Sequence, residues 1–182
     1  YSEAMRDLPG ENTPENMQII IDEANRLTDL VNDLLDLSRL QAGAQTLRPE
    51  RFNLTEQVER SMQRYAKLVA QEGYVITFEH QGAAWVNADP LKISQVLYNL
   101  INNAINYTGP DKRVRVVQTV EGERVKLSVI DTGEGIAAED LPYIWDRYYK
   151  VDKTHRRGAV GTGLGLSIVR AVLEAHKAQY GA

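Results

Sequence analysis

A glycine-rich run near the end of the chain has a spacing that suggests phosphate binding. Residues 161–166 read Gly-Thr-Gly-Leu-Gly-Leu and lead directly into an apolar-periodic stretch, so three glycines precede a predicted helix. Glycine lets the backbone approach an anion closely, and the free N–H groups at a helix N-terminus complement negative charge. Close packing of a turn is the alternative explanation of such glycines. The candidate phosphate-binding residues are Gly161, Thr162, Gly163, Leu164, Gly165 and Leu166.

Amide side chains recur along the predicted helix over residues 90–107. Asn99, Asn103 and Tyr107 follow one another at intervals of four, and Asn106 adds to the amide density. Asparagine is a mediocre helix former, so several in one helix need a reason. Solvated surface amides are one explanation. The other is that Asn99 and Asn103 offer carbonyl oxygens to Mg²⁺, which completes its octahedron with water and phosphate.

An aspartate followed by spaced glycines ends the predicted strand over residues 124–130. Asp131 can accept a hydrogen bond from an exocyclic amine, while Gly133 and Gly135, before Ile136, leave room for a flat base. A plain Asp-Thr-Gly turn would account for the same residues.

A basic polar stretch follows at 145–159 and directly precedes the glycine run. It contains Lys150 and Arg157 and has no apolar periodicity. Such stretches are usually solvated surface, but this one could fold over bound phosphates as a lid, with Lys150 as the best-placed cation.

Composition limits the setting in which these residues act. The chain has 182 residues, of which 43% are hydrophobic and 25% charged, and this suits a soluble globular protein of one or two domains. Its net charge of −4 gives no reason to expect a nucleic-acid partner. The absence of cysteine excludes disulfides and thiolate zinc sites. No apolar run approaches the ~20 residues that span a bilayer, so no direct membrane contact is expected.

The N-terminal part predicts a helical hairpin. Apolar residues at intervals of three and four predict a helix over 15–42 with Gly43 as its C-cap, residues 1–8 resemble the end of another helix, and 9–14 are rich in helix breakers. The short link implies antiparallel helices. Their wide apolar stripe favours a homodimeric four-helix bundle, with docking on the rest of the chain as the alternative.

The remainder predicts an α+β fold with a two-layer sandwich. Helices are expected at 55–71, where Asn53 and Glu56 have capping-box spacing, and at 90–107, where Asp89 and a proline begin the helix well. Further helices are expected at 138–144 and 167–175. Strands are expected at 52–54, 74–79, 84–86, 113–120 and 124–130.

Taken together, these blocks resemble the ATP-binding domain of sensor histidine kinases, a branch of the Bergerat-fold ATPases that also includes gyrase and the ninety-kilodalton heat-shock chaperones. The N box resembles residues 99–107, the G1 box 131–135, the F box 145–150 and the G2 box 161–166. Residues 23–39 are similar to the second helix of the family's dimerisation and phosphoacceptor hairpin, so the resemblance covers almost the whole chain.

The resemblance implies ATP and Mg²⁺ as cofactors. Asn103 would ligate Mg²⁺ with Asn99 close by, Asp131 would bind the adenine amine, and Tyr107 and Lys150 would contact the nucleotide. Asn99 and Lys150 would be the catalytic residues. Hydrolytic members carry a glutamate where this chain has Asn99, and an amide cannot activate water as a general base, which favours transfer to an acceptor.

Two positions depart from the family pattern. Lysine is frequent where this chain has Asn106, so Lys150, Arg156 or Arg157 would take over a phosphate contact. The F box begins with Trp145 in place of phenylalanine, an exchange that preserves aromatic packing.

The family's phosphoacceptor histidine has no counterpart in this sequence. None of His80, His155 and His176 has the expected context, and each is expected to be structural or solvated. We therefore expect residues 1–46 to be a truncated dimerisation and phosphoacceptor hairpin without its acceptor. Residues 47–182 would be the catalytic ATP-binding domain, which in the family continues into one or two more strands.

The implied function is an ATP-dependent histidine kinase core of a two-component sensor, which is cytoplasmic and belongs to a parent that can be membrane-anchored. Its partners would be a second copy and the receiver domain of a response regulator. The alternatives are a hydrolytic Bergerat ATPase, a serine kinase of the anti-sigma class, and a dimeric scaffold without activity.

Overall fold

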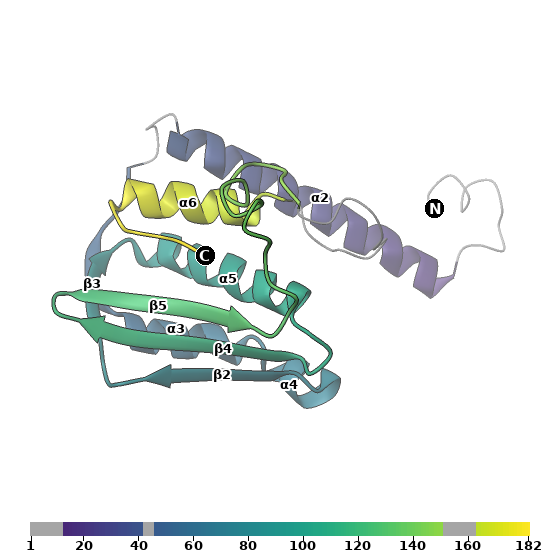
Figure 1. Cartoon of the computed structure of the whole chain (residues 1–182). Helices are drawn as coiled ribbons and strands as arrows, with labels where there is room; N and C mark the ends of the chain where they lie inside the picture. Colours follow the sequence, from purple (N-terminus) through teal and green to yellow (C-terminus); the bar gives the residue numbers. More distant parts are fainter. Residues whose placement is uncertain (1–12, 42–45, 151–162) are drawn as a thin grey trace.

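A computed structural model of the chain describes residues 13–41, 46–150 and 163–182 (Figure 1). It begins with a long helix, α2 (Pro14–Gln41), and continues into an α+β domain. Thr13 caps α2, because its hydroxyl accepts the N–H of Asn16 at 3.2 Å and its carbonyl accepts that of Met17 at 3.0 Å. The predicted partner helix at 1–8 and the C-cap at Gly43 lie outside the described residues.

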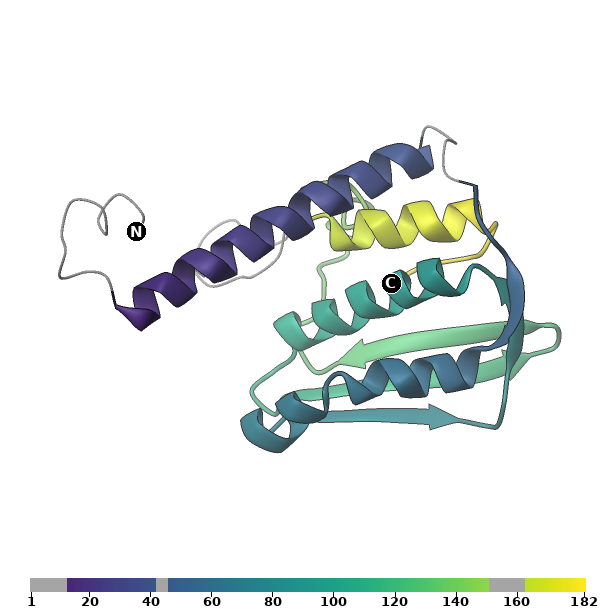
Figure 2. The ribbon, with the colours of Figure 1, turned by 180° about the vertical axis from the view of Figure 1, so that it is seen from behind.

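The predicted apolar stripe of α2 faces solvent over much of its length. Met17, Leu27, Val31 and Leu34 keep the predicted three- and four-residue spacing and are 42–57% exposed. One end of the helix nevertheless runs alongside α6 (Gly165–Ala175) in both views (Figures 1 and 2). Within the described residues, α2 therefore touches the domain while its stripe stays uncovered.

Two small sheets form the β part of the domain. Strands β2 (Val75–His80), β4 (Arg113–Glu121) and β5 (Arg124–Asp131) lie in the order β2-β4-β5, with β2 parallel and β5 antiparallel to β4. Strands β1 (Glu50–Asn53) and β3 (Trp85–Ala88) form a separate antiparallel pair. The predicted hairpin around Gly122 is confirmed as the β4–β5 connection.

Helices cover one face of the larger sheet, and no helix of the described ranges covers the other (Figures 1 and 2). Helices α3 (Leu54–Gln63) and α5 (Pro90–Tyr107) share a core with the sheet, built around residues such as Val58, Leu97 and Val116. Helix α6 packs on α5 through a second cluster that contains Val96, Ile168 and Val172. The predicted α+β two-layer sandwich is confirmed.

The prediction of one continuous helix over 55–71 is wrong. The structure divides it into α3 and α4 (Ala66–Glu72), with Arg64 and Tyr65 in a turn between them. Tyr65 is buried in the core, and its hydroxyl donates to Asn102 Oδ1 at 3.3 Å. Burial of the Tyr65 side chain contributes more free energy than the backbone hydrogen bonds of an unbroken helix would. The turn between α3 and α4 is therefore favoured.

The predicted helix at 138–144 is also wrong, because the structure has a series of turns there. Asp140 N–H donates to the Ala137 carbonyl, and the N–H groups of Tyr143 and Ile144 donate to the Asp140 carbonyl. Ile144 is buried, and the carboxylate of Asp140 accepts a hydrogen bond from the Tyr149 hydroxyl. Turn hydrogen bonds, the contact of Asp140 with Tyr149 and the burial of Ile144 therefore characterise this segment.

Asp89 joins three parts of the fold at the start of α5. Its Oδ1 accepts the N–H groups of Leu91 and Lys92, and its Oδ2 accepts that of Arg48, in the linker that follows α2, at 2.9 Å. Its own N–H donates to Nε2 of His176 at the end of α6, while the other ring nitrogen of His176 lies 2.8 Å from the Val172 carbonyl. The predicted structural role of His176 agrees with these contacts.

Replacing Asp89 with alanine is expected to lower the free energy of unfolding by about 2 kcal/mol near neutral pH, because three N–H groups lose an anionic acceptor. Burial raises the pKa of Asp89, but the three backbone N–H groups outweigh it and hold the pKa below its usual range. The stabilisation is therefore complete above the unfolded pKa of about 3.9 and is lost as the pH falls through the folded value. Urea unfolding of both proteins at pH 7 and pH 3 measures this.

The difference between the two proteins should shrink at pH 3. Asp89→Asn keeps one acceptor oxygen for the helix cap and should lose less stability than the alanine variant. A difference that grows on acidification would contradict this account.

Candidate nucleotide-binding site

The amide side chains of helix α5 lie outside the core because its apolar residues occupy the face that packs against the rest of the domain. Val96, Leu97, Ile101 and Ala104 are buried against the sheet, α3 and α6. Asn99 and Asn103 are half-buried beside them, whereas Asn106 and Tyr107 are exposed. The predicted helix bounds are confirmed at both ends, so these side chains lie on the helix as the sequence indicated.

The start of α6 lies against the amide row of α5. A Cβ built on Gly165 would lie 3.5 Å from Oδ1 of Asn99, which places the first turn of α6 beside that amide. The Leu164 side chain is fully buried in the α5–α6 core, and Leu166 is half-buried. Leu164 thus anchors the N-terminus of α6, and only its backbone can face a ligand.

Gly163 is required for the packing of the backbone against Tyr148. Its φ is +72°, and a Cβ there would lie 2.9 Å from Cα of Tyr148. The N–H of Tyr148 donates to the Gly163 carbonyl at 2.8 Å. The packing explanation of the glycine run is therefore correct for this one position, which fixes where α6 can begin.

The Asp131 turn lies against the C-terminal end of α5. Asp131 is the last residue of β5, and its Oδ1 accepts the N–H of Gly133 at 2.8 Å. A Cβ on Gly133 would lie only 2.1 Å from the Tyr107 carbonyl oxygen, so the two backbones are in direct contact. Gly135 has a φ of +78°, and Ile136 is exposed. The structure therefore brings Tyr107, Asp131 and Gly133 together.

Three further residues tie the Asp131 turn to α5, and the sequence analysis missed them. The hydroxyl oxygens of Thr108 and Thr132 lie 3.0 Å apart. Thr132 donates to Oδ1 of Asp111, and the Thr108 hydroxyl lies 2.8 Å from the Arg113 carbonyl. Their signal was weak, since threonine and aspartate beside Gly109 and Pro110 are ordinary turn residues.

Aromatic contacts fix the segment that leads to Lys150. Tyr143 and Tyr149 have ring centroids 5.7 Å apart, and the hydrogen bond to Asp140 raises the pKa of Tyr149 to about 12. Lys150 is half-buried at the end of this segment. The candidates Arg157, Gly161 and Thr162 lie outside the described residues, as do His155 and Arg156.

The oxygen donors of α5 suit Mg²⁺ only together with a phosphate ligand. No group of three or more His, Cys, Asp or Glu side chains in the described part of the chain could hold a metal. Asn99 and Asn103 offer neutral amide oxygens, which are acceptable ligands for a hard cation but are too few to hold one alone. An ion bound here would take its remaining ligands from phosphate and water.

Comparison with known proteins identifies the family of the chain. Residues 88–181, slightly more than half of the chain, match the family described as histidine kinase-, DNA gyrase B-, and HSP90-like ATPases. The chain belongs to this family. Residues 1–43 match the His Kinase A (phospho-acceptor) domain, which agrees with the resemblance to sensor histidine kinases. A member of this ATPase family binds ATP, and the predicted ATP cofactor is thereby confirmed.

Individual relatives agree with the family assignment. Sensor protein SrrB of Staphylococcus aureus is 35% identical over 162 residues, which are 89% of this chain and 28% of SrrB. The chain thus spans about 28% of the length of the curated relatives it matches. None of the helices in the described ranges is both long enough and apolar enough to cross a membrane.

Two solved structures share the fold of this chain. Acinetobacter baumannii histidine kinase AdeS superimposes with a TM-score of 0.78 at 26% identity, over 95% of this chain and 79% of that one. Histidine kinase ThkA in complex with the response regulator protein TrrA gives a TM-score of 0.67 at 25% identity, over 82% and 45% of the two chains.

Proposed function

We propose that the chain binds Mg·ATP along α5 and is the kinase core of a two-component sensor. The observation that carries the proposal is that one helix meets both ends of a nucleotide site. Its C-terminal end contacts the Asp131 turn through Gly133, and its middle contacts the N-terminus of α6 at Gly165. A base at the first place and phosphates at the second would lie along α5.

Each residue of the site has a distinct proposed role. Asp131 accepts a hydrogen bond from the adenine amine with Oδ2, while its Oδ1 accepts the N–H of Gly133. The N-terminus of α6 and its glycines receive the phosphates. Asn103 holds Mg²⁺, which neutralises phosphate charge during transfer, and Asn99 assists it. Tyr107, Asn106 and Lys150 contact the nucleotide, with Arg157 as a further cation.

Asn99 favours transfer of the phosphoryl group to an acceptor over its hydrolysis. A general base must accept a proton from the attacking water, and a carboxamide has no such capacity at neutral pH. The work left to the chain is therefore to position the reactants and neutralise charge, as is typical of phosphoryl transfer.

The acceptor we propose is a histidine of the phosphoacceptor domain, in a homodimer that buries the exposed stripe of α2. The match of residues 1–43 to that domain supports the acceptor, and the exposed Leu27 and Val31 support the dimer. Neither described histidine lies on α2, since His80 ends β2 and His176 follows α6. From that histidine the phosphoryl group would pass to an aspartate in a receiver domain, a partner class that the ThkA–TrrA complex supports. The site of action would be the cytoplasm, where ATP is available.

Calorimetric titration of this chain with ATP, in Mg²⁺ and in EDTA, tests the proposal. We expect binding that is markedly tighter with Mg²⁺, no Mg²⁺ binding without nucleotide, and no steady release of phosphate. Absence of ATP binding would indicate the inactive scaffold. Sustained turnover would indicate the hydrolytic ATPase.

A further inference from the structure

We infer that Thr132, held by Asp111 and Thr108, is a positioning residue that aims the Asp131 carboxylate at the base. The inference rests on the proposed function, because it presumes that Asp131 receives an adenine amine. Thr132 itself touches no part of the nucleotide in this account. It acts through the backbone on which Asp131 and Gly133 stand.

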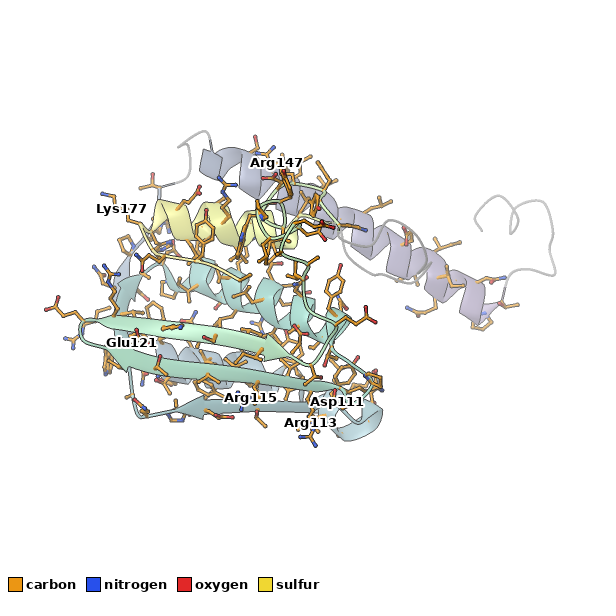
Figure 3. The ribbon with its side chains drawn as sticks, viewed as in Figure 1. Asp111, Arg113, Arg115, Glu121, Arg147 and Lys177 are labelled. Atoms are coloured by element: carbon orange, nitrogen blue, oxygen red, sulfur yellow. The ribbon has the colours of Figure 1, made fainter. Side chains whose placement is uncertain are left out.

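Thr132 occupies the point at which three elements meet. It follows the last residue of β5, Thr108 follows the last residue of α5, and Asp111 lies in the turn that leads into β4. Figure 3 shows Asp111 at the end of the sheet where β5 also finishes. A hydroxyl at this junction can therefore bind the other two elements to the Asp131 turn.

The hydroxyl contacts form a chain across the three elements. Thr132 donates its one hydroxyl proton to Oδ1 of Asp111. The Thr108 hydroxyl donates to the Arg113 carbonyl at 2.8 Å, and its oxygen lies 3.0 Å from Thr132 Oγ1. Arg113 Nε lies 3.8 Å from the second oxygen of Asp111 and offsets its charge. Thr132 is thus hydrogen-bonded to Asp111 on one side and lies against Thr108 on the other.

The backbone around Thr132 leaves little room for another arrangement. A Cβ on Gly109 would lie 2.6 Å from the Thr132 carbonyl oxygen, so the turn after α5 packs directly on this peptide. On the other side, Gly133 presses on the Tyr107 carbonyl and donates to Asp131 Oδ1.

Backbone contacts hold Gly133, but they do not by themselves fix the end of β5. Gly135, with a φ of +78°, has the conformational freedom of glycine, and β5 pairs only with β4 in the described part of the sheet. The side chain of Thr132 adds a constraint to those that the backbone supplies. Loss of its hydroxyl should let the Asp131 turn shift and misalign the carboxylate with the amine while the fold persists.

The preference for adenine over hypoxanthine distinguishes a positioning role of Thr132 from a purely structural one. Adenine presents an amine to Asp131, whereas hypoxanthine presents a carbonyl oxygen that leaves the carboxylate unpaired. The ratio of ADP affinity to inosine diphosphate affinity therefore reports how well the Asp131 carboxylate is oriented toward the base amine. A general loss of stability would weaken both ligands alike.

The test measures this ratio by calorimetry for the wild-type chain and four variants. Thr132→Val keeps the shape of the side chain, and we expect the preference for ADP to fall roughly tenfold, about the worth of one misaligned hydrogen bond to a charged group. Thr132→Ser restores the hydroxyl and should recover most of it. Asp111→Ala, at an exposed position, should lower the preference even if Thr132→Val folds poorly. Thr77→Val, at an exposed threonine of β2, is the matched control and should change nothing.

The outcomes distinguish this inference from the function it rests on. An unchanged ratio in Thr132→Val and Asp111→Ala, or a serine variant as impaired as the valine variant, would overturn the positioning role alone. A wild-type chain that binds neither nucleotide, or binds both equally, would overturn the proposed site and the inference together.

Discussion

Replacing Gly133 with alanine is expected to eliminate useful nucleotide binding. The added Cβ would lie 2.1 Å from the Tyr107 carbonyl oxygen and 2.8 Å from Oδ1 of Asp131, and the first contact is with backbone that cannot rotate away. Relief requires the Asp131 turn to move off the end of α5. Absorbing such a clash costs about 3 kcal/mol, which corresponds to roughly a hundredfold loss in ATP affinity if the strain falls on the bound state.

Gly181→Ala is the matched control for this variant. A Cβ on Gly181 meets no atom within 4 Å, so the same chemical change should leave affinity and stability unaltered. Isothermal calorimetry gives the affinity, and thermal unfolding shows whether the variant is folded. A folded Gly133→Ala protein that binds ATP normally would contradict the placement of the base beside this turn.

Replacing Asn103 with alanine is expected to reduce phosphoryl transfer by at least about a hundredfold, because the amide oxygen that would hold Mg²⁺ is lost. Binding of ATP in EDTA should be nearly unchanged, since no base contact is removed. The rate of incorporation of γ-labelled phosphate into a protein that carries the complete phosphoacceptor domain followed by this chain measures the first effect, and calorimetric titration with ATP in EDTA measures the second. Asn102→Ala, one residue along α5, is the control.

Asn102 accepts the Tyr65 hydroxyl at 3.3 Å in the core. Its loss should therefore affect stability and leave the Mg²⁺ dependence of transfer intact. If Asn103→Ala and Asn102→Ala lose the same activity, Asn103 has no special part in holding the metal.

Local signals in the sequence predicted the elements that carry the site. The bounds of α5 could be predicted because Asp89 and Pro90 mark its start, and Thr108, Gly109 and Pro110 mark its end. The β4–β5 hairpin followed from alternation around Gly122. Predictions failed where side-chain burial and side-chain hydrogen bonds, not local periodicity, accompany the observed conformation. Burial of Tyr65 interrupts a helix, and the contacts of Asp140 and Ile144 replace another with turns.

The residues that could carry the chemistry of the site were predictable from the sequence, but the contacts that bring its parts together were less so. Spacing along one helix identified Asn99 and Asn103, and an aspartate before glycines identified Asp131. Nothing local indicated that Thr108, Asp111 and Thr132 would meet, because their contact depends on how the end of α5 and the end of β5 are brought together. Gly163 illustrates the same limit, since the Tyr148 backbone that excludes a Cβ there is brought close only by the fold.

The most direct test of the central claim is the chemistry of the phosphorylated residue. A protein that carries the complete phosphoacceptor domain followed by this chain is incubated with γ-labelled Mg·ATP, and the labelled protein is treated with acid or alkali. The account predicts label that is stable in alkali and lost in acid, as expected for a phosphoramidate on histidine, and almost none with Asn103→Ala. Acid-stable label on a hydroxyl side chain, or release of inorganic phosphate from ATP without protein labelling, would contradict it.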